Sequence, residues 1–133
     1  MLNVALLTLA SIELAKPLSS CSPPLGAESR FYPDEIPSVL LKTLAQYGPI
    51  AGQGEPFNDS DVLHPGLPQS GVIFIWSSGA HWVITLARGG FVPLSEVSVY
   101  TLINDHVVRR EADQSTQRGM ECEAARRLFG ALP

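Results

Sequence analysis

Three short segments follow one another closely in the middle of this chain: the first is an apolar run rich in β-branched residues, and the other two show the two-residue alternation of a strand. The first is Val72–Trp76, which ends at a Ser-Ser-Gly turn signal; the second covers residues 81–86 and the third residues 97–103. Alternation with β-branched and aromatic residues predicts β-strands. Strands so close in sequence connect as antiparallel neighbours, because a parallel crossover needs a dozen or more residues. The sequence therefore predicts an antiparallel meander, with a short fourth strand at 106–109.

Helical spacing is found on both sides of this meander. Apolar residues recur three and four positions apart over 34–47, where Gly-Pro then stops the run. A second helix is predicted after a cap at Asp113 or Ser115, with an apolar stripe that starts at Met120. Between the first helix and the meander, residues 48–70 are rich in Gly and Pro and predict a long irregular loop. Helix, long loop, three- to four-stranded meander and C-terminal helix together predict an α+β domain.

Length and composition indicate one globular domain. The chain has 133 residues, of which 45% are hydrophobic and 17% charged, and this apolar content excludes an intrinsically disordered chain. A net charge of −4 argues against binding to the phosphate backbone of nucleic acids. We expect a signal segment at 1–21, a Pro- and Gly-containing linker at 22–30, and a single α+β domain at 31–133.

The N-terminal residues favour export. Residues 2–12 form an apolar run of the length of a secretory signal core, too short to span a bilayer. Leu18-Ser19-Ser20-Cys21 resembles the lipobox of bacterial lipoproteins, and predicts a periplasmic or lipid-tethered protein. Two features oppose export: no Lys or Arg precedes the run, and Glu13 and Lys16 follow it. The alternative is a cytoplasmic protein whose N-terminal helix packs on the core.

The chain has two cysteines, and their spacing leaves their state open. Cys21 and Cys122 can form a disulfide in an exported protein. If Cys21 is instead lipidated or removed, Cys122 is a lone thiol in a helix, where cysteine usually behaves as a small buried hydrophobe.

His81 is the residue most typical of catalysis. It stands in Gly-Ala-His-Trp-Val-Ile, which resembles the histidine strand of papain-like and bacteriocin-processing cysteine peptidases. The resemblance implies Cys21 as nucleophile, His81 as base, and Asn104 or Asp105 as the group that orients the ring. However, two prolines follow Cys21 closely, which disfavours the helix N-terminus that activates such thiols, and no Gln precedes it. A cysteine hydrolase is therefore the alternative hypothesis, and a structural strand-end histidine is favoured.

The remaining polar residues predict binding or structure rather than metal chemistry. The three histidines lack metal-ligand spacing, and no cofactor motif is found. The loop segment Asn58-Asp59-Ser60-Asp61 lacks the features of a calcium loop, so we expect Asn58, Ser60 or Asp61 to bond to local backbone. Trp76 and Trp82 flank the first turn of the meander; they form either an exposed aromatic platform or core, and core is favoured for Trp82. The candidate binding residues are Trp76, His81, Asn58 and Asp61.

A second resemblance covers more of the chain, about residues 36–92. Several motifs in this region are similar to those of a group of small exported proteobacterial proteins of unknown function. The resemblance implies a signal peptide, a helix, a loop of this type and a β-meander, and it assigns no activity. It also implies that Asn58, Asp61 and the Gly-Gly pair fix the loop geometry. The motifs are Tyr47-Gly48-Pro49-Ile50-Ala51-Gly52, Glu55-Pro56-Phe57-Asn58-Asp59-Ser60-Asp61-Val62, Gly66-Leu67-Pro68, Trp82-Val83 and Gly89-Gly90.

These observations predict a small exported binding protein without catalytic activity, of inhibitor or immunity type. Its expected partner is another protein, not a nucleic acid, and it meets a membrane only through a lipid anchor. No cofactor or metal is expected. The alternative function is a papain-like hydrolase that uses Cys21, His81 and Asn104.

Overall fold

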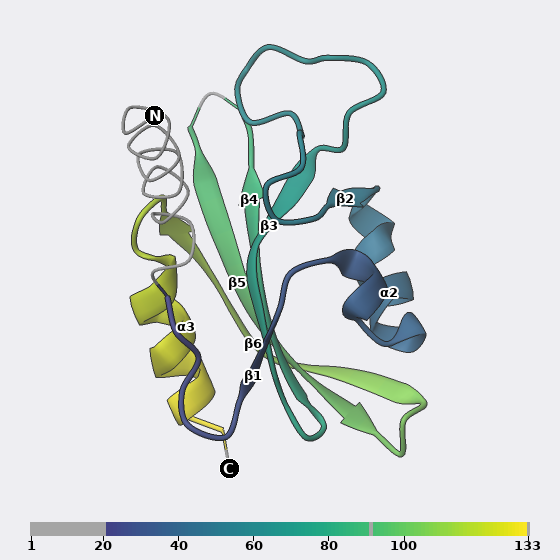
Figure 1. The fold of residues 1–133 in the computed structure, drawn as a ribbon, viewed down its shortest axis with the longest axis vertical. Helices are drawn as coiled ribbons and strands as arrows, with labels where there is room; N and C mark the ends of the chain where they lie inside the picture. Colours follow the sequence, from purple (N-terminus) through teal and green to yellow (C-terminus); the bar gives the residue numbers. More distant parts are fainter. Residues whose placement is uncertain (1–20, 91, 133) are drawn as a thin grey trace, which may run out of the picture.

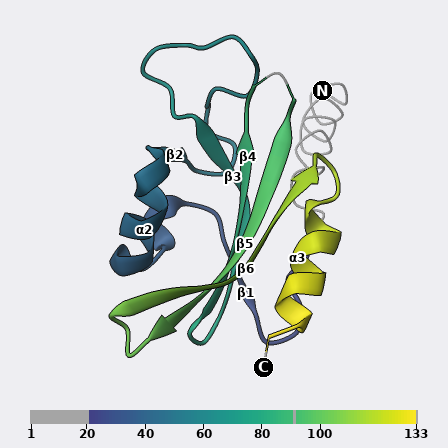
Figure 2. The same cartoon turned by 180° about the vertical axis from the view of Figure 1, so that it is seen from behind.

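The computed structural model describes residues 21–90 and 92–132, so the predicted signal segment at 1–20 lies outside the described residues. One twisted sheet runs through the molecule, with a helix on either side (Figures 1 and 2). Its strands are β1 (Glu28–Arg30), β2 (Ile50–Ala51), β3 (Ser70–Ser78), β4 (His81–Arg88), β5 (Leu94–Ile103) and β6 (Val107–Gln117). The helices are α2 (Ser38–Leu44), with short 3-10 turns at Pro33–Glu35 and Ala45–Tyr47, and α3 (Glu121–Gly130).

The sheet confirms the α+β class and extends the predicted meander. The strand order is β1-β3-β4-β5-β6, and every neighbouring pair along this path is antiparallel. The two-residue β2 pairs in parallel with the start of β3. The predicted three or four strands were too few, because the short strands β1 and β2 were not recognised, and the predicted fourth strand covers only the start of β6.

Strand β1 lies inside the segment that the sequence predicts as a linker. Glu28–Arg30 pairs with Ser77, Trp76 and Ile75 of β3. Three polar residues carry no hydrophobic alternation, so backbone pairing and not side-chain burial places them in the sheet.

Strand β6 is far longer than the predicted fourth strand. It continues to Gln117, and α3 begins only at Glu121. Asp113 and Ser115 therefore lie in a strand and do not cap the helix. Among the described strands, β6 pairs with β5 alone, and such an edge strand needs little apolar sequence, so residues 112–117 can be polar or small.

Pro37 divides the predicted helix at 34–47. Ile36, the residue before it, is extended at φ −89° and ψ 137°, as expected from the clash of the proline ring with a preceding helical residue. A 3-10 turn therefore precedes Ile36, and α2 starts only at Ser38.

The two faces of the sheet carry separate cores. The α2 face buries Ile36, Leu40 and Leu44 of the helical segment against the sheet. On the other face α3 buries the apolar residues Ala124 and Ala125, with Leu128 and Phe129 partly buried beside them. Sheet residues of the α2 face are Val72, Ile75, Trp82, Ile84, Leu86, Tyr100 and Leu102. Those of the α3 face are Phe74, Trp76, Val83, Val97 and Val99. Within residues 21–90 and 92–132, no helix is long and apolar enough to cross a membrane.

Candidate functional site

The long segment between β2 and β3 projects from one end of the sheet as a closed loop (Figure 1). The Asn58 backbone N–H donates to the Pro68 carbonyl oxygen at 2.8 Å and joins the two ends of the loop. We call residues 58–68 the apical loop. Compact surface loops with adjoining ends are often functional.

A single buried side chain holds the apical loop in shape. Asn58 is only 2% exposed. Its Oδ1 accepts from the His64 backbone N–H at 2.8 Å, and its Nδ2 donates to the carbonyl oxygens of Leu67 at 3.2 Å and His64 at 3.4 Å. Three backbone groups thus depend on one amide, which confirms the expectation that Asn58 bonds local backbone.

The absence of a side chain at Gly89 allows the backbone of the apical loop to lie against the end of β4. A Cβ at Gly89 would overlap the Asn58 carbonyl oxygen, and one at Gly71 would overlap the ring of Phe57. The Gly-Gly pair therefore does fix the loop, through the missing side chain of Gly89. Arg118 adds an outer support: its Nη2 donates to Asp59 Oδ1 at 2.7 Å and to the Arg88 carbonyl oxygen at 2.9 Å.

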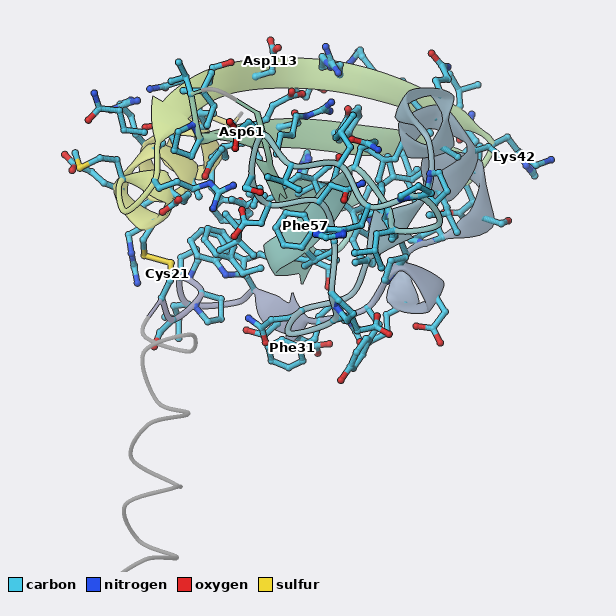
Figure 3. All side chains as sticks on the ribbon, turned by 90° about the horizontal axis from the view of Figure 1, so that it is seen from above. Cys21, Phe31, Lys42, Phe57, Asp61 and Asp113 are labelled. Atoms are coloured by element: carbon cyan, nitrogen blue, oxygen red, sulfur yellow. A yellow bond between two sulfur atoms is a disulfide. The ribbon has the colours of Figure 1, made fainter. Side chains whose placement is uncertain are left out.

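The tip of the apical loop presents apolar side chains to solvent. Val62 is 58% exposed and Leu63 is 67% exposed, although the loop beneath them is tied to the sheet. Ser60 Oγ accepts from the Val62 N–H at 3.2 Å and shapes the turn. Asp61 is exposed beside them (Figure 3). The tip thus presents an exposed apolar pair next to the carboxylate of Asp61.

A cavity of about 310 Å³ lies between the sheet and the residues that lead into the apical loop, at the lower limit of small-molecule sites. Its polar wall residues already bond within the protein: Gln53 Nε2 donates to the Ile73 carbonyl oxygen at 2.7 Å, and Glu55 Oε1 accepts from the Gly52 N–H at 2.7 Å. These contacts favour a supporting role for the cavity walls. The lining residues are Gln53, Gly54, Glu55, Phe57, Asp59, Val72, Ile73, Ala87 and Arg118.

His81 belongs to a polar cluster at the opposite end of β4. Its Nδ1 lies 2.9 Å from Thr101 Oγ1. Glu111 completes the cluster: hydrogen bonds from Arg109 and then Thr101, with the nearby charges of Arg109 and His81, lower the pKa of its carboxyl against a smaller effect of burial. Arg109 Nε donates to Glu111 Oε1 at 2.8 Å. The ring of His81 is therefore fixed by a hydroxyl, as a strand-end structural histidine is.

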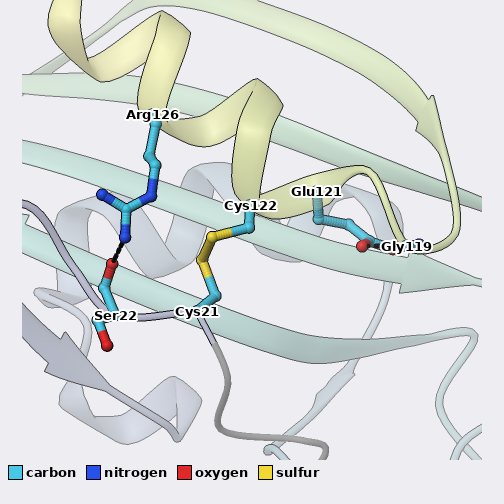
Figure 4. The surroundings of a disulfide bond; sticks show 6 residues. All are labelled: Cys21, Ser22, Gly119, Glu121, Cys122 and Arg126. Carbon is cyan, nitrogen blue, oxygen red and sulfur yellow. Dashed lines mark hydrogen bonds between the residues drawn. A yellow bond between two sulfur atoms is a disulfide. The ribbon is translucent and has the colours of Figure 1, made fainter.

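The residues of the alternative cysteine hydrolase do not form a triad. Cys21 is bonded to Cys122 in a disulfide (Figure 4), and no free cysteine is found in the described part of the chain. Asn104 lies in the β5–β6 turn with φ 53°, next to Asp105 at φ 57°. The His81 ring bonds to Thr101 and neither of these. The geometry therefore gives no support to this alternative.

Trp76 is not a surface platform. It is 0% exposed, its ring stacks on Phe74 with centroids 4.8 Å apart, and Phe129 meets it edge-on. The binding role predicted for Trp76 is therefore wrong, because α3 covers this strand end. Trp82, 7% exposed, lies in the core as expected.

Over the described ranges, no group of three His, Cys, Asp or Glu residues is arranged to hold a metal ion. Comparison with protein-family models, with curated proteins and with solved structures found no match. Sequence reasoning identified Asn58 and Asp61 but missed Val62, Leu63 and Arg118, since an irregular loop has no periodicity that marks exposed apolar residues.

Proposed function

We propose that this chain is a small exported protein without catalytic activity that binds another protein through the apical loop, as an inhibitor or immunity-type protein does. The observation that carries this is the tip: Val62 and Leu63 are exposed on a loop fixed by the buried Asn58. A fixed loop loses little conformational freedom on binding, so more of its contact energy appears as affinity.

The disulfide supports the exported part of the proposal. Disulfides persist in oxidising compartments and are rare in the cytosol. Because Cys21 uses its sulfur for the bond to Cys122, a periplasmic protein is favoured over one tethered by a lipid on Cys21. The resemblance to small exported proteins points the same way.

The chemistry of the tip defines the partner. Val62 and Leu63 fit an apolar pocket, and Asp61 beside them favours a basic rim around that pocket. Since the whole chain carries a net charge of −4, a basic partner surface is expected to increase the association rate at low salt.

Differential capture from a cell-envelope extract tests this function. The oxidised wild-type protein is immobilised beside the double variant Val62→Asp/Leu63→Asp and the control Leu25→Asp. Leu25 is a fully exposed apolar residue outside the apical loop, so this control also replaces an exposed leucine by aspartate but leaves the loop unchanged. We expect one stoichiometric protein captured by wild type and Leu25→Asp and lost with the double variant. Equal capture by all three would contradict the proposal.

A second variant tests the role of loop order. Asn58→Ala leaves buried backbone groups without partners and should lower the free energy of unfolding by about 1–3 kcal/mol. We expect it also to weaken capture while Val62 and Leu63 remain present. Full binding with a disordered loop, monitored by amide hydrogen exchange of residues 59–67, would show that preorganisation is not needed.

A further inference from the structure

Strand β6 forms an open edge of the sheet. It is 11 residues long and stands last in the strand order, and no other described strand pairs with its outer side. Such an edge offers backbone N–H and C=O groups to another strand. The edge carries charges of both signs, with Arg109 and Arg110 followed by Glu111 and Asp113, so a second strand that places opposite charges face to face is favoured over one that places like charges together.

A bulge in β6 determines which side chains share a face. Val99 pairs with Ala112 and Tyr100 with Arg110, so Glu111 is the extra residue. Arg110 lies on the α2 face, where its Nη2 donates to the Tyr100 hydroxyl at 3.1 Å. Ala112 packs in the α3-face core. Even-numbered residues such as Arg110 therefore lie on the α2 face before the bulge, whereas even-numbered residues such as Ala112 lie on the α3 face after it.

The contacts of Asp113 and Gln114 confirm that odd-numbered residues lie on the α2 face after the bulge and even-numbered residues on the α3 face. Asp113 Oδ2 lies 3.6 Å from Arg110 Nη1 on the α2 face, and Figure 3 shows Asp113 at the outer margin of the molecule. Gln114 Oε1 accepts from Arg127 of α3 and so lies on the α3 face. Before the bulge, Arg109 pairs across the ladder with Thr101, the partner of His81 on that same face.

This change of face at the bulge selects one register for a second copy of β6. Facing residues of an antiparallel pair must lie on the same face of the sheet. With a two-fold axis between Glu111 and Ala112, every facing pair crosses the bulge and meets this condition; shifting the axis along β6 brings neighbours from opposite faces together. In this register Arg110 faces Asp113 of the second copy, twice by symmetry, and Arg109 faces Gln114.

We infer that two copies of this chain associate through antiparallel pairing of their β6 edges, with reciprocal Arg110–Asp113 ion pairs across the two-fold axis. The interface is isologous and therefore closed. It leaves the apical loop of each copy outside the pair of strands, so the inference does not depend on the proposed function.

Sedimentation and light scattering of the oxidised protein test the inference, at concentrations up to about 1 mM. We expect wild type to reach twice the monomer mass. Asp113→Arg and Arg110→Asp should each remain monomeric, because like charges then face each other twice. A wild type that is monomeric throughout, or a dimer that survives both changes, would overturn the inference.

Mixing the two single variants separates this pairing from the Arg110–Asp113 contact within one chain. In the mixture each arginine of one chain faces an aspartate of the other, so we expect a heterodimer with an affinity restored at least tenfold over either variant alone. An intrachain role predicts no effect of mixing. Asp34→Arg and Lys42→Glu, which make the same charge changes on exposed sites outside β6, should leave dimerisation unchanged.

A crosslink gives a readout that does not depend on charge or on Arg110 packing. In the proposed register Val108 faces Ser115 of the second copy, within the reach of a disulfide. Mixed Val108→Cys and Ser115→Cys proteins should form a crosslinked heterodimer on mild oxidation, and Leu25→Cys should not pair with either. Absence of that crosslink would exclude this register.

Discussion

The two helices are attached to the same sheet in different ways. The α2 segment inserts large aliphatic side chains, with Leu40 0% exposed. The α3 helix buries only two small apolar residues, Ala124 and Ala125, and packs the half-buried Leu128 and Phe129 against the same core. Polar and covalent bonds add to this packing: the buried Glu121 accepts from Ser95 Oγ at 2.7 Å, and Cys122 is bonded to Cys21. The α2 layer is therefore held by large buried side chains, whereas the α3 layer combines less apolar burial with a covalent bond that only an oxidising compartment maintains.

Removing the covalent bond is expected to have the largest effect. The disulfide joins residues 101 positions apart, and in the chain-entropy model a loop of about 100 residues is stabilised by about 4.7 kcal/mol. We expect Cys21→Ala/Cys122→Ala to lose up to about that free energy of unfolding in urea titrations. Amide exchange should accelerate first in α3 and later in α2. A loss below about 1 kcal/mol would show that α3 is held by packing after all.

Truncation of buried leucines compares packing in the two layers. Leu40→Ala should cost about 2–5 kcal/mol, since it leaves a cavity in a closed core. Leu128→Ala on α3 should cost only about 1–2 kcal/mol, because Leu128 is half-buried and has less apolar surface to lose. Urea unfolding of both variants in the oxidised state measures the difference. Equal losses would remove the contrast between the layers.

The smallest expected effect is a pH dependence from the α3 face. Glu111 has a pKa below its ordinary value of 4.5, first because Arg109 donates to it. The unfolded chain therefore binds more protons between the two pKa values, and stability rises with pH in that window. The contribution is complete above 4.5 and disappears as the pH falls through the lowered pKa.

Glu111→Gln tests this sign. The variant should lose the part of the stability slope that lies below pH 4.5, and its thermal midpoint should approach that of wild type at the acid end. A variant with an unchanged slope would assign the pH dependence to other carboxyl groups.

The sequence predicts the elements whose apolar residues form a clear pattern. It does not predict elements whose conformation depends on pairing with a distant segment. Strand β3 contains an apolar β-branched run and strands β4 and β5 alternate, and all three were predicted within a few residues. The end of β6 was assigned to a helix cap because Asp113 and Ser115 are typical cap residues, and their strand state follows from pairing with β5. No local pattern records such a partner.

The candidate site shows the same division. Asn58 was expected to bond backbone, because asparagine in a loop commonly does. The path of the whole loop decides that the Asn58 amide bonds His64 and Leu67, and no local pattern predicts it. Likewise, Arg118 donates to Asp59, which is 59 positions away in the sequence. Trp76 was misjudged because only α3, a distant segment, decides whether that strand end is covered.

We propose that the protein is exported and that the Cys21–Cys122 disulfide helps to hold α3 on the sheet. The most direct measurement is thiol trapping of the protein in its native host, followed by intact mass determination. We predict a processed chain that takes up no alkylating group until it is reduced and then takes up one on each cysteine. A chain that starts at Met1 with both cysteines alkylated before reduction, or one that carries acyl groups on Cys21, would contradict the account.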